Sequence, residues 1–169
     1  MELLSEIANR KSIRSFVNEP LPKEAIERIL EAGRRAPSAK NRQAWRFVLV
    51  TDQTTRNRIK EAAFHEEYVA DAPAIIAVCT TNIDYQMPNG QLSYPVDLAF
   101  AASFMLLQAE HEGLGSCILT TYREADVKAV LSVPYRMRVV VLLLVGKAKE
   151  TPELGRRFPL SRVVGYQHW

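Results

Sequence analysis

The sequence predicts one α+β domain, residues 1–169, with about three or four strands and five helices. Three apolar runs rich in valine, isoleucine and leucine indicate strands, and stretches with helical spacing of apolar residues lie between them. Hydrophobic residues make up 47% of the chain and charged residues 24%, which is typical of a globular domain with its own core. No repeat, low-complexity tract or linker divides the chain.

The N-terminal part is expected to hold two helices joined by an extended basic segment. Apolar residues at helical spacing predict the first helix around residues 3–7, and residues 10–16 form the basic segment. Pro22 suits the first turn of the second helix, and Gly33 suits its C-terminal cap. A polar loop at residues 36–43 follows.

The middle of the chain is expected to contain two strands separated by a helix. Residues 45–50 predict the first strand, and residues 74–79 predict the second. Between them, residues 54–70 predict a helix that is rich in charge on one side. Residues 84–95 contain two prolines and a glycine and therefore predict a loop.

A long helix is expected at residues 97–112, and it is apolar around much of its circumference. A helix of this kind belongs in a core or an interface, because water would surround its apolar side chains elsewhere. Gly113 and Gly115 are expected to end it.

The C-terminal part predicts a short helix, a strand and a tail. Thr121 and Glu124 have the spacing of a capping box for a helix that ends at Leu131. Residues 138–145 predict a buried strand. The tail, residues 156–169, contains two valines and a terminal tryptophan, so we expect it to pack on a surface that another subunit provides.

The charge pattern indicates a small anionic partner rather than a nucleic acid. The net charge of +3 is mildly basic and falls short of a dedicated nucleic-acid binder. Clustered cations suit a phosphate, although a solvated basic face accounts for the charge alone equally well. The two clusters are Arg10, Lys11 and Arg14, and Arg34, Arg35, Lys40, Arg42 and Arg46.

Neither a membrane span nor a metal site is expected. The longest unbroken apolar run, residues 139–145, is too short to cross a bilayer. The N-terminus carries acids where a signal peptide would carry basic residues, so we expect a cytoplasmic protein. Cys79 and Cys117 are expected to be buried thiols, and the histidines and cysteines lack the spacing of metal ligands.

The common catalytic motifs are absent from the sequence. It contains no Gly-x-Ser-x-Gly elbow, no Walker loop and no Gly-x-Gly-x-x-Gly. The glycine pair at residues 113–115 follows a helix, whereas a dinucleotide fingerprint would follow a strand. If the chain is an enzyme, a cofactor is expected to carry the reaction.

The basic segment provides the strongest local signal. Residues 10–14 place three cations and a hydroxyl within five positions, and a phosphate or a polar ring edge needs such donors. In an extended segment, Arg10, Ser12 and Arg14 point the same way. A charged loop after a helix remains the alternative.

The polar loop gives a second signal. Residues 37–45 carry serine, asparagine and glutamine directly before a strand. These side chains suit a polyol or an amide ring, although by themselves they are more typical of a turn.

Together, and in this order, the two segments resemble the nitroreductase family of flavoproteins. The family opening resembles residues 10–16 (Arg-Lys-Ser-Ile-Arg-Ser-Phe), and its second motif resembles residues 36–45 (Ala-Pro-Ser-Ala-Lys-Asn-Arg-Gln-Ala-Trp). Two later motifs resemble residues 113–117 (Gly-Leu-Gly-Ser-Cys) and 157–160 (Arg-Phe-Pro-Leu). The resemblance extends over almost the whole chain, and the four motifs in the right order make it specific.

The resemblance implies a bound FMN. Arg10, Lys11, Ser12 and Arg157 would hold its phosphate and the neighbourhood of the phosphate. Arg14 would approach the pyrimidine edge of the isoalloxazine ring. Because reduced flavin carries negative charge there, a fixed guanidinium would stabilise the reduced form.

Two further segments are implied as FMN contacts. The partner subunit would supply Pro37, Ser38, Asn41 and Gln43. The segment Leu119, Thr120 and Thr121 would lie along one face of the flavin ring. A backbone N–H of this segment would reach toward flavin N5.

The resemblance also implies the fold, the assembly and the reaction. The fold would be a mixed, mostly antiparallel sheet flanked by helices, with the C-terminal tail exchanged in a homodimer. Electrons would pass from NADH or NADPH through flavin N5 to a small-molecule acceptor such as a nitroaromatic or a quinone, with ping-pong kinetics. No side chain would act as a general acid or base.

The sequence departs from the family pattern in two places and is short for the family. Ala44 stands where proline is frequent, and Thr121 stands at the N5-facing position where glycine is common. The region 80–95 is brief, so we expect an open pocket in which Tyr85, Met87 and Tyr94 are candidates for the lining. His65 is a weak candidate for the pyrimidine end of the flavin.

Other functions remain open at this level. The same fold could support reductive dehalogenation or flavin metabolism, or it could bind flavin without turnover. A basic nucleic-acid-binding module is disfavoured, because few aromatic residues lie near the basic clusters.

Overall fold

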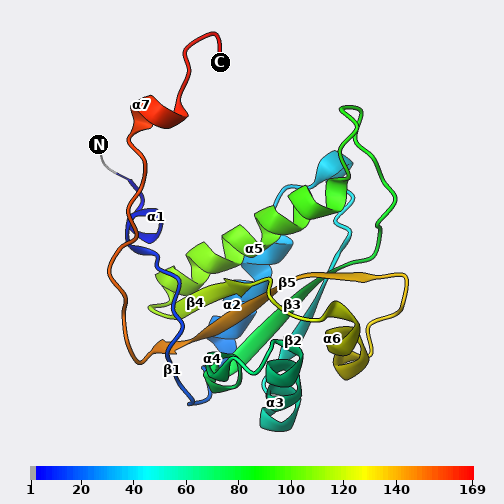
Figure 1. Cartoon of the computed structure of the whole chain (residues 1–169), viewed down its shortest axis with the longest axis vertical. Helices are drawn as coiled ribbons and strands as arrows, with labels where there is room; N and C mark the ends of the chain where they lie inside the picture. Colours follow the sequence, from blue (N-terminus) through cyan, green and yellow to red (C-terminus); the bar gives the residue numbers. More distant parts are fainter. Residues whose placement is uncertain (1–2) are drawn as a thin grey trace.

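A five-stranded β-sheet forms the centre of the computed structural model, which describes residues 3–169 (Figure 1). The strand order is β1-β5-β3-β2, and β4 also pairs with β5. The named strands pair antiparallel throughout, and one isolated parallel bridge joins Ser12 to Ser116. The strands are β1 (Phe16–Val17), β2 (Trp45–Val50), β3 (Ala74–Thr80), β4 (Gly115–Leu119) and β5 (Arg138–Ala148).

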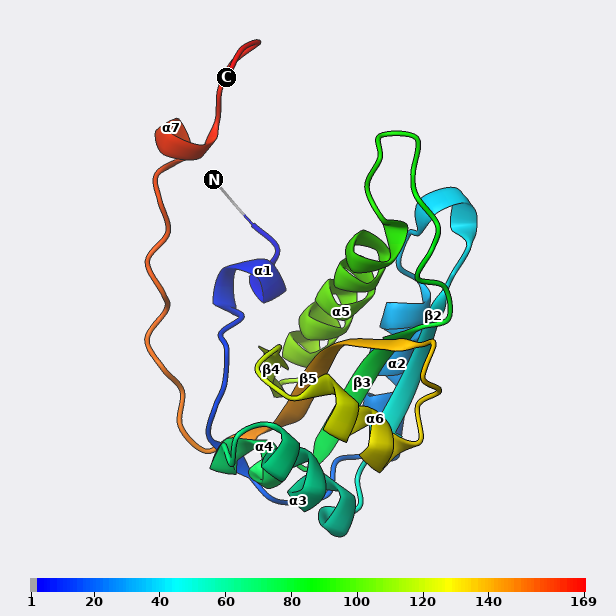
Figure 2. The same cartoon turned by 45° about the vertical axis from the view of Figure 1, so that its right-hand side comes forward.

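Helices cover both faces of this sheet (Figures 1 and 2). On one face pack α2 (Lys23–Arg34) and α5 (Ser93–His111). On the other pack α3 (Gln53–Ala62), α4 (Glu67–Asp71) and α6 (Glu124–Leu131). Three shorter elements complete the chain: α1 (Ser5–Asn9), the 3₁₀ turn η1 (Ala39–Asn41) and α7 (Leu160–Val163).

The central strand β5 explains the continuous apolar run seen in the sequence. Side chains alternate between the two faces of a strand. Leu143 and Val145 therefore belong to the core beneath α2 and α5, and Leu142 and Leu144 belong to the core beneath α3, α4 and α6. All four are buried. The expected α+β class and the three expected strands are confirmed.

The helix expected over residues 54–70 is wrong as a single element. The chain forms α3 and α4 instead, because Phe64 and His65 adopt left-handed backbone conformations with φ of 57° and 64°. Non-glycine residues rarely adopt this conformation, and helical spacing of apolar residues does not reveal it. The expected loop at 84–95 is also too long. Helix α5 begins at Ser93, and its first turn accommodates Pro95.

Three predicted helix-end signals have other roles, and one of them, Gly115, lies in β4 instead of ending α5. Gly33 is not a cap but lies inside α2, where an added Cβ would collide with Cε of Met105. The Thr121–Glu124 capping box does not form, because the N-cap of α6 is Arg123 and has no side-chain cap. Strand β4 was not expected at all, since its glycine, serine and cysteine weaken the strand pattern.

The C-terminal tail leaves the sheet at the end of β5 and runs past α1 (Figures 1 and 2). Every residue of the range 147–169 is exposed, including the large apolar side chains of Phe158, Leu160 and Trp169. Its exchange with another subunit stays a prediction. None of the helices in the described part of the chain has the length and apolarity needed to cross a membrane.

Replacing Gly33 with alanine is expected to destabilise the fold by about 1–3 kcal/mol, because buried Met105 must move to admit the new methyl group. In a Met105→Ala background the same change should instead stabilise α2 by up to about 1 kcal/mol through helix propensity. Urea unfolding of the four proteins in this cycle measures both values. Equal effects of Gly33→Ala in the two backgrounds would contradict the packing explanation.

Candidate cofactor site

The basic segment lies along the edge of β4. The amide of Ile13 donates to the carbonyl oxygen of Ser116 at 3.0 Å, and the Ile13 side chain is buried. An added Cβ at Gly115 would stand 2.7 Å from Cγ1 of Ile13, so only glycine permits this close approach. The packing of Ile13 fixes the backbone that carries Arg10, Lys11, Ser12 and Arg14.

The cations of this segment have no acidic partners. Within residues 3–169, Arg10, Lys11 and Arg14 form no ion pair. Burial raises the pKa of the Cys117 thiol, and the charges of Arg14 and Arg10 oppose that rise. Burial likewise raises the pKa of Tyr68, while Arg14 lowers it by charge and by a hydrogen bond. The three cations are therefore not neutralised by acids in the described part of the chain, and such a group suits an anion.

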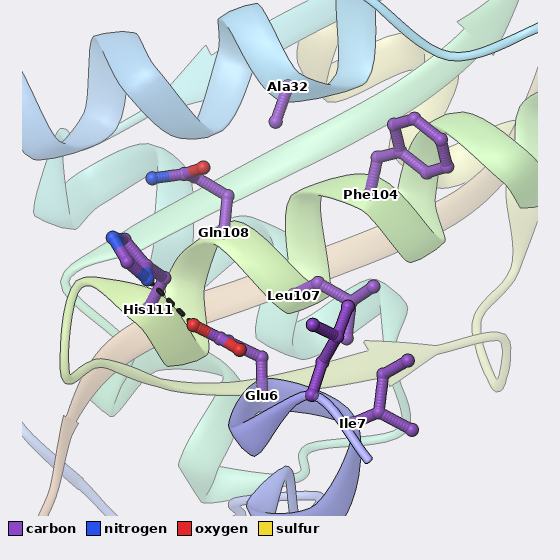
Figure 3. Close-up of a pocket in the computed structure, with 8 residues that line it drawn as sticks. Glu6, Ile7, Ala32, Phe104, Leu107, Gln108 and His111 are labelled. Atoms are coloured by element: carbon purple, nitrogen blue, oxygen red, sulfur yellow. Dashed lines mark hydrogen bonds and ion pairs between the residues drawn. The ribbon is translucent and has the colours of Figure 1, made fainter. Parts of the chain in front are cut away.

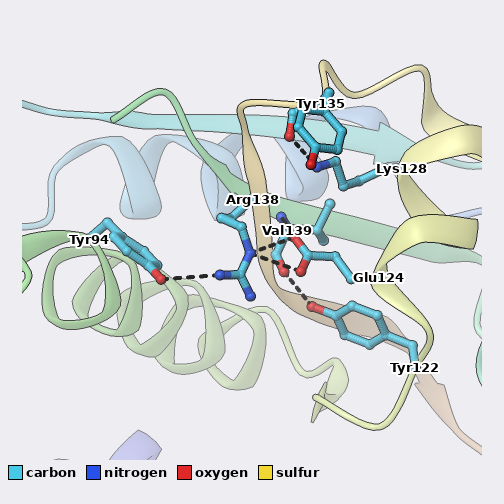
Figure 4. Close-up of polar contacts among 7 residues, drawn as sticks. All are labelled: Tyr94, Tyr122, Glu124, Lys128, Tyr135, Arg138 and Val139. Carbon is cyan, nitrogen blue, oxygen red and sulfur yellow. Dashed lines mark hydrogen bonds and ion pairs between the residues drawn. The ribbon is translucent and has the colours of Figure 1, made fainter. Parts of the chain in front are cut away.

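The segment after β4 is held from both sides of Thr120 and Thr121. Leu119 before it is buried, and the Tyr122 hydroxyl behind it donates to the Val139 carbonyl at 2.7 Å (Figure 4). Burial raises the pKa of Tyr122, which keeps this hydroxyl protonated as a donor. The two threonines are exposed between these fixed points.

Glu124 supplies the second tie on this segment. Its carboxylate accepts from Nε of Arg138 and from the backbone amide of Val139, each at 2.9 Å (Figure 4). This contact explains why Glu124 does not cap α6. The sequence analysis identified residues 119–121 but missed Tyr122, Glu124 and Arg138. No local pattern in the sequence indicates that Tyr122 and Glu124 bond to residues of β5.

The polar loop at residues 37–43 forms a strained turn. The Ser38 hydroxyl accepts from the Gln43 amide at 3.0 Å. Lys40, Asn41 and Gln43 all adopt left-handed conformations, with φ of 51°, 54° and 51°. The Ala39 amide donates to Oδ1 of Asp97, near the start of α5, at 2.9 Å. Such strain persists only where surrounding contacts hold it, and it is frequent at ligand sites.

The structure does not bring the two predicted halves of the site together. The strained turn contacts the start of α5 through Asp97, whereas Lys11 lines a cavity of about 380 Å³ with Glu110 and Gly113 near the end of α5. With a rise of about 1.5 Å per residue, Asp97 and Glu110 lie about 20 Å apart along the helix. In Figure 1 the cyan turn and the segment after α1 occupy opposite sides of the sheet. One chain thus presents two separate half-sites.

The remaining candidates contribute little in the single chain. Arg157 lies in the exposed tail, where its guanidinium donates to the carbonyls of Gly155 and Arg156. The guanidinium of Arg42 lies 3.9 Å from the ring centroid of Tyr85, and the Tyr94 hydroxyl contacts Arg138 at 3.5 Å. Met87 belongs to a tight turn closed by its own backbone, and His65 lies between α3 and α4.

An apolar pocket of about 440 Å³ lies between α1, α2 and α5 (Figure 3). Leu4, Ile7 and Phe104 line it and are exposed. Nδ1 of His111 lies 2.7 Å from Oε1 of Glu6 and joins α5 to α1, and this contact lowers the Glu6 pKa to about 2. Exposed apolar side chains gathered on two helices are typical of an interaction surface.

Comparison with known proteins gives the family. The profile of the Nitroreductase family matches residues 7–69 and 64–147, which is most of the chain. The chain belongs to the nitroreductase family.

Similar proteins agree with this membership over nearly the whole chain. An NADH dehydrogenase of Thermus thermophilus is 30% identical over 92% of this chain and 91% of its own length. A nitroreductase family protein of Clostridium difficile has a similar structure, with a TM-score of 0.88, 26% identity and complete coverage of both chains. The NADPH:FMN oxidoreductase of Vibrio harveyi has a TM-score of 0.88 and 29% identity over 98% of this chain and 77% of its own.

Two relatives are named iodotyrosine deiodinases. An iodotyrosine deiodinase of Thermotoga neapolitana is 27% identical over 86% of this chain and 89% of its own length. Family membership therefore leaves more than one reaction to consider.

A methyl group at Gly115 is expected to displace Ile13 and with it the basic segment. Gly115→Ala should weaken FMN binding roughly tenfold or more, about 1.4 kcal/mol, as judged by fluorescence titration of the apoprotein. Gly33→Ala is the matched control, since it strains the core beneath α2 far from this segment. Equal FMN affinities of the two variants would contradict the proposed role of Gly115.

Proposed function

We propose that this chain is an FMN-dependent oxidoreductase that passes electrons from NADH or NADPH to a small acceptor such as a nitroaromatic or a quinone. The observation that carries the proposal is the set of unpaired cations, Arg10, Lys11 and Arg14, on a backbone packed against β4. Support comes from the family and from the flavin oxidoreductase among its similar structures.

The donor set fits the chemistry of FMN. Two guanidinium groups, an ammonium group and the Ser12 hydroxyl match the hydrogen-bonding needs of a phosphate and a polar ring edge. Arg14 would place its positive charge where a reduced ring carries negative charge and so would favour reduction. The exposed backbone at Thr120 and Thr121 would provide an N–H donor for N5, and the threonine at 121 leaves this donor intact.

The side chains near this site are suited to binding and orientation rather than to proton transfer. The bound flavin would supply the hydride chemistry. Burial holds Cys79 protonated, with a pKa of about 11, and it raises the pKa values of Cys117 and Tyr122 as well. These groups therefore provide neither a thiolate nucleophile nor a base near neutral pH.

A homodimer would complete the site. The strained turn contacts the start of α5 and the basic segment lies near its end, so a second copy would supply the turn to a flavin bound by the basic segment. Apolar side chains on α1 and α5, with the apolar tail, are the surface that such a partner would cover. Binding a ligand across two chains would also stabilise the assembly.

Reductive dehalogenation is the second candidate, and the deiodinase relatives favour it. The region between β3 and α5 is a loop with one isolated bridge, Gln86 to Leu92, and no helix of its own. An open site of this kind favours broad acceptor choice over capture of one halogenated substrate. Comparing turnover of nitroaromatics and quinones with that of iodotyrosine separates the two reactions.

The visible spectrum of the purified protein is expected to show bound flavin, and anaerobic NADH or NADPH should bleach it. Bleaching followed by recovery with a nitroaromatic or a quinone would establish both half-reactions. A yellow protein that no nicotinamide reduces would indicate flavin binding without turnover. A colourless protein that FMN does not reconstitute would overturn the proposed function.

A mixed dimer tests whether the two half-sites come from different chains. Arg14→Ala and Asn41→Gly are chosen because each alters one half-site, and glycine accepts the left-handed backbone at residue 41. Each homodimer should bind FMN weakly at both sites. A dimer of one chain of each kind should recover one site of wild-type affinity, because both defects fall on the other site. Titration of dimers isolated by two affinity tags measures this, and absence of the recovered site would contradict assembly in trans.

A further inference from the structure

Asp97 is a buried carboxylate that the proposed function leaves unused. It lies in α5 one turn from the helix start, and only 2% of its surface is exposed. Oδ1 accepts from the Ala39 amide at 2.9 Å. Oδ2 is buried and has no hydrogen-bond partner in the described part of the chain.

This arrangement is costly for stability alone. A buried carboxylate oxygen without a partner loses its hydrogen bonds to water, and no hydrogen bond within the protein replaces them. Across residues 3–169, no lysine, arginine or histidine pairs with Asp97. What the carboxylate does provide is a charge-assisted hydrogen bond to one backbone N–H, which is stronger than a bond between neutral groups.

That N–H belongs to the strained turn. Ser38 is extended, with φ of −144°, and Lys40, Asn41 and Gln43 then follow in left-handed conformations. The bond from Gln43 to the Ser38 hydroxyl closes the turn on itself but does not fix it to the rest of the fold.

Hydrogen bonds at both ends connect the turn to the core. The Thr81 amide donates to the Ala44 carbonyl at 2.8 Å and holds the end that enters β2. Asp97 holds the other end through Ala39, and α5 is anchored in the core by Leu98 and Ala101, which are fully buried. Among the hydrogen bonds of the described residues, the one from Ala39 to Asp97 is the bond that ties this side of the turn to α5.

We propose that Asp97 is a positioning residue that holds the strained turn in the conformation that contacts FMN. It acts through the Ala39 amide and does not itself touch the cofactor. The inference rests on the proposed function, in which the turn meets the flavin bound by the partner subunit.

Two variants of Asp97 separate its hydrogen bond from its charge. Asp97→Ala removes the acceptor and should raise the FMN dissociation constant about tenfold. Asp97→Asn retains an oxygen acceptor and similar volume, so it should bind FMN within about threefold of wild type. The circular dichroism of the bound flavin should change in the alanine variant and be restored in the asparagine variant.

Ala39→Pro removes the donor and leaves Asp97 in place. The extended Ser38 suits the residue before a proline, and a 3₁₀ turn accepts proline at its first position. This variant should lose FMN affinity to the same extent as Asp97→Ala. Ile59→Val, a mild change in the core of α3 on the opposite face, controls for general loss of stability.

The outcomes distinguish this inference from the proposed function. If the wild-type protein binds no FMN in the same titration, the proposed function fails. If wild type binds FMN and Asp97→Ala binds it equally well, the positioning role of Asp97 fails alone. Suppose that Ile59→Val and Asp97→Ala have the same thermal unfolding midpoint. An equal loss of FMN affinity in both variants would then also overturn the positioning role of Asp97.

Discussion

Strand β5 hydrogen-bonds to β3 along one edge and to β4 along the other, its end also pairs with β1, and helices bury both of its faces. Each part of the candidate site on this side of the sheet depends on that strand. It holds β4, whose edge receives the basic segment, and its residue Val139 receives both Tyr122 and Glu124. The backbone of the candidate site on this side of the sheet is therefore fixed by the strand that pairs with three others.

The separation of the two half-sites follows from the same sheet. The turn precedes β2 at one edge, and the basic segment lies beside β4 at the other, with β3 and β5 between them. The cations of the basic segment repel one another without acidic neighbours, and the polar turn holds a strained backbone. Both features lower the stability of an isolated chain. A shared anionic ligand would offset both costs, which is why the proposed function and the proposed assembly depend on each other.

The sequence predicted the apolar elements well, because strands β2, β3 and β5 and helix α5 are all rich in apolar side chains. The sequence was least informative where a single backbone angle or a contact between distant residues determines the structure. The left-handed residues Phe64 and His65 divide one expected helix, and Glu124 bonds to β5 rather than capping α6. The basic segment and the polar turn were recognised by their motifs, but no local pattern connects Asp97 to Ala39 across 58 positions.

The contact between Gly115 and Ile13 also constrains how this sequence can evolve. The space for a β-carbon at position 115 is already filled by the side chain at position 13. An alanine could become established at the first position only after, or together with, a smaller residue at the second. These two positions, distant in the chain, are thus expected to change as a pair among descendants of this protein, and their covariation would record the close approach without any structure.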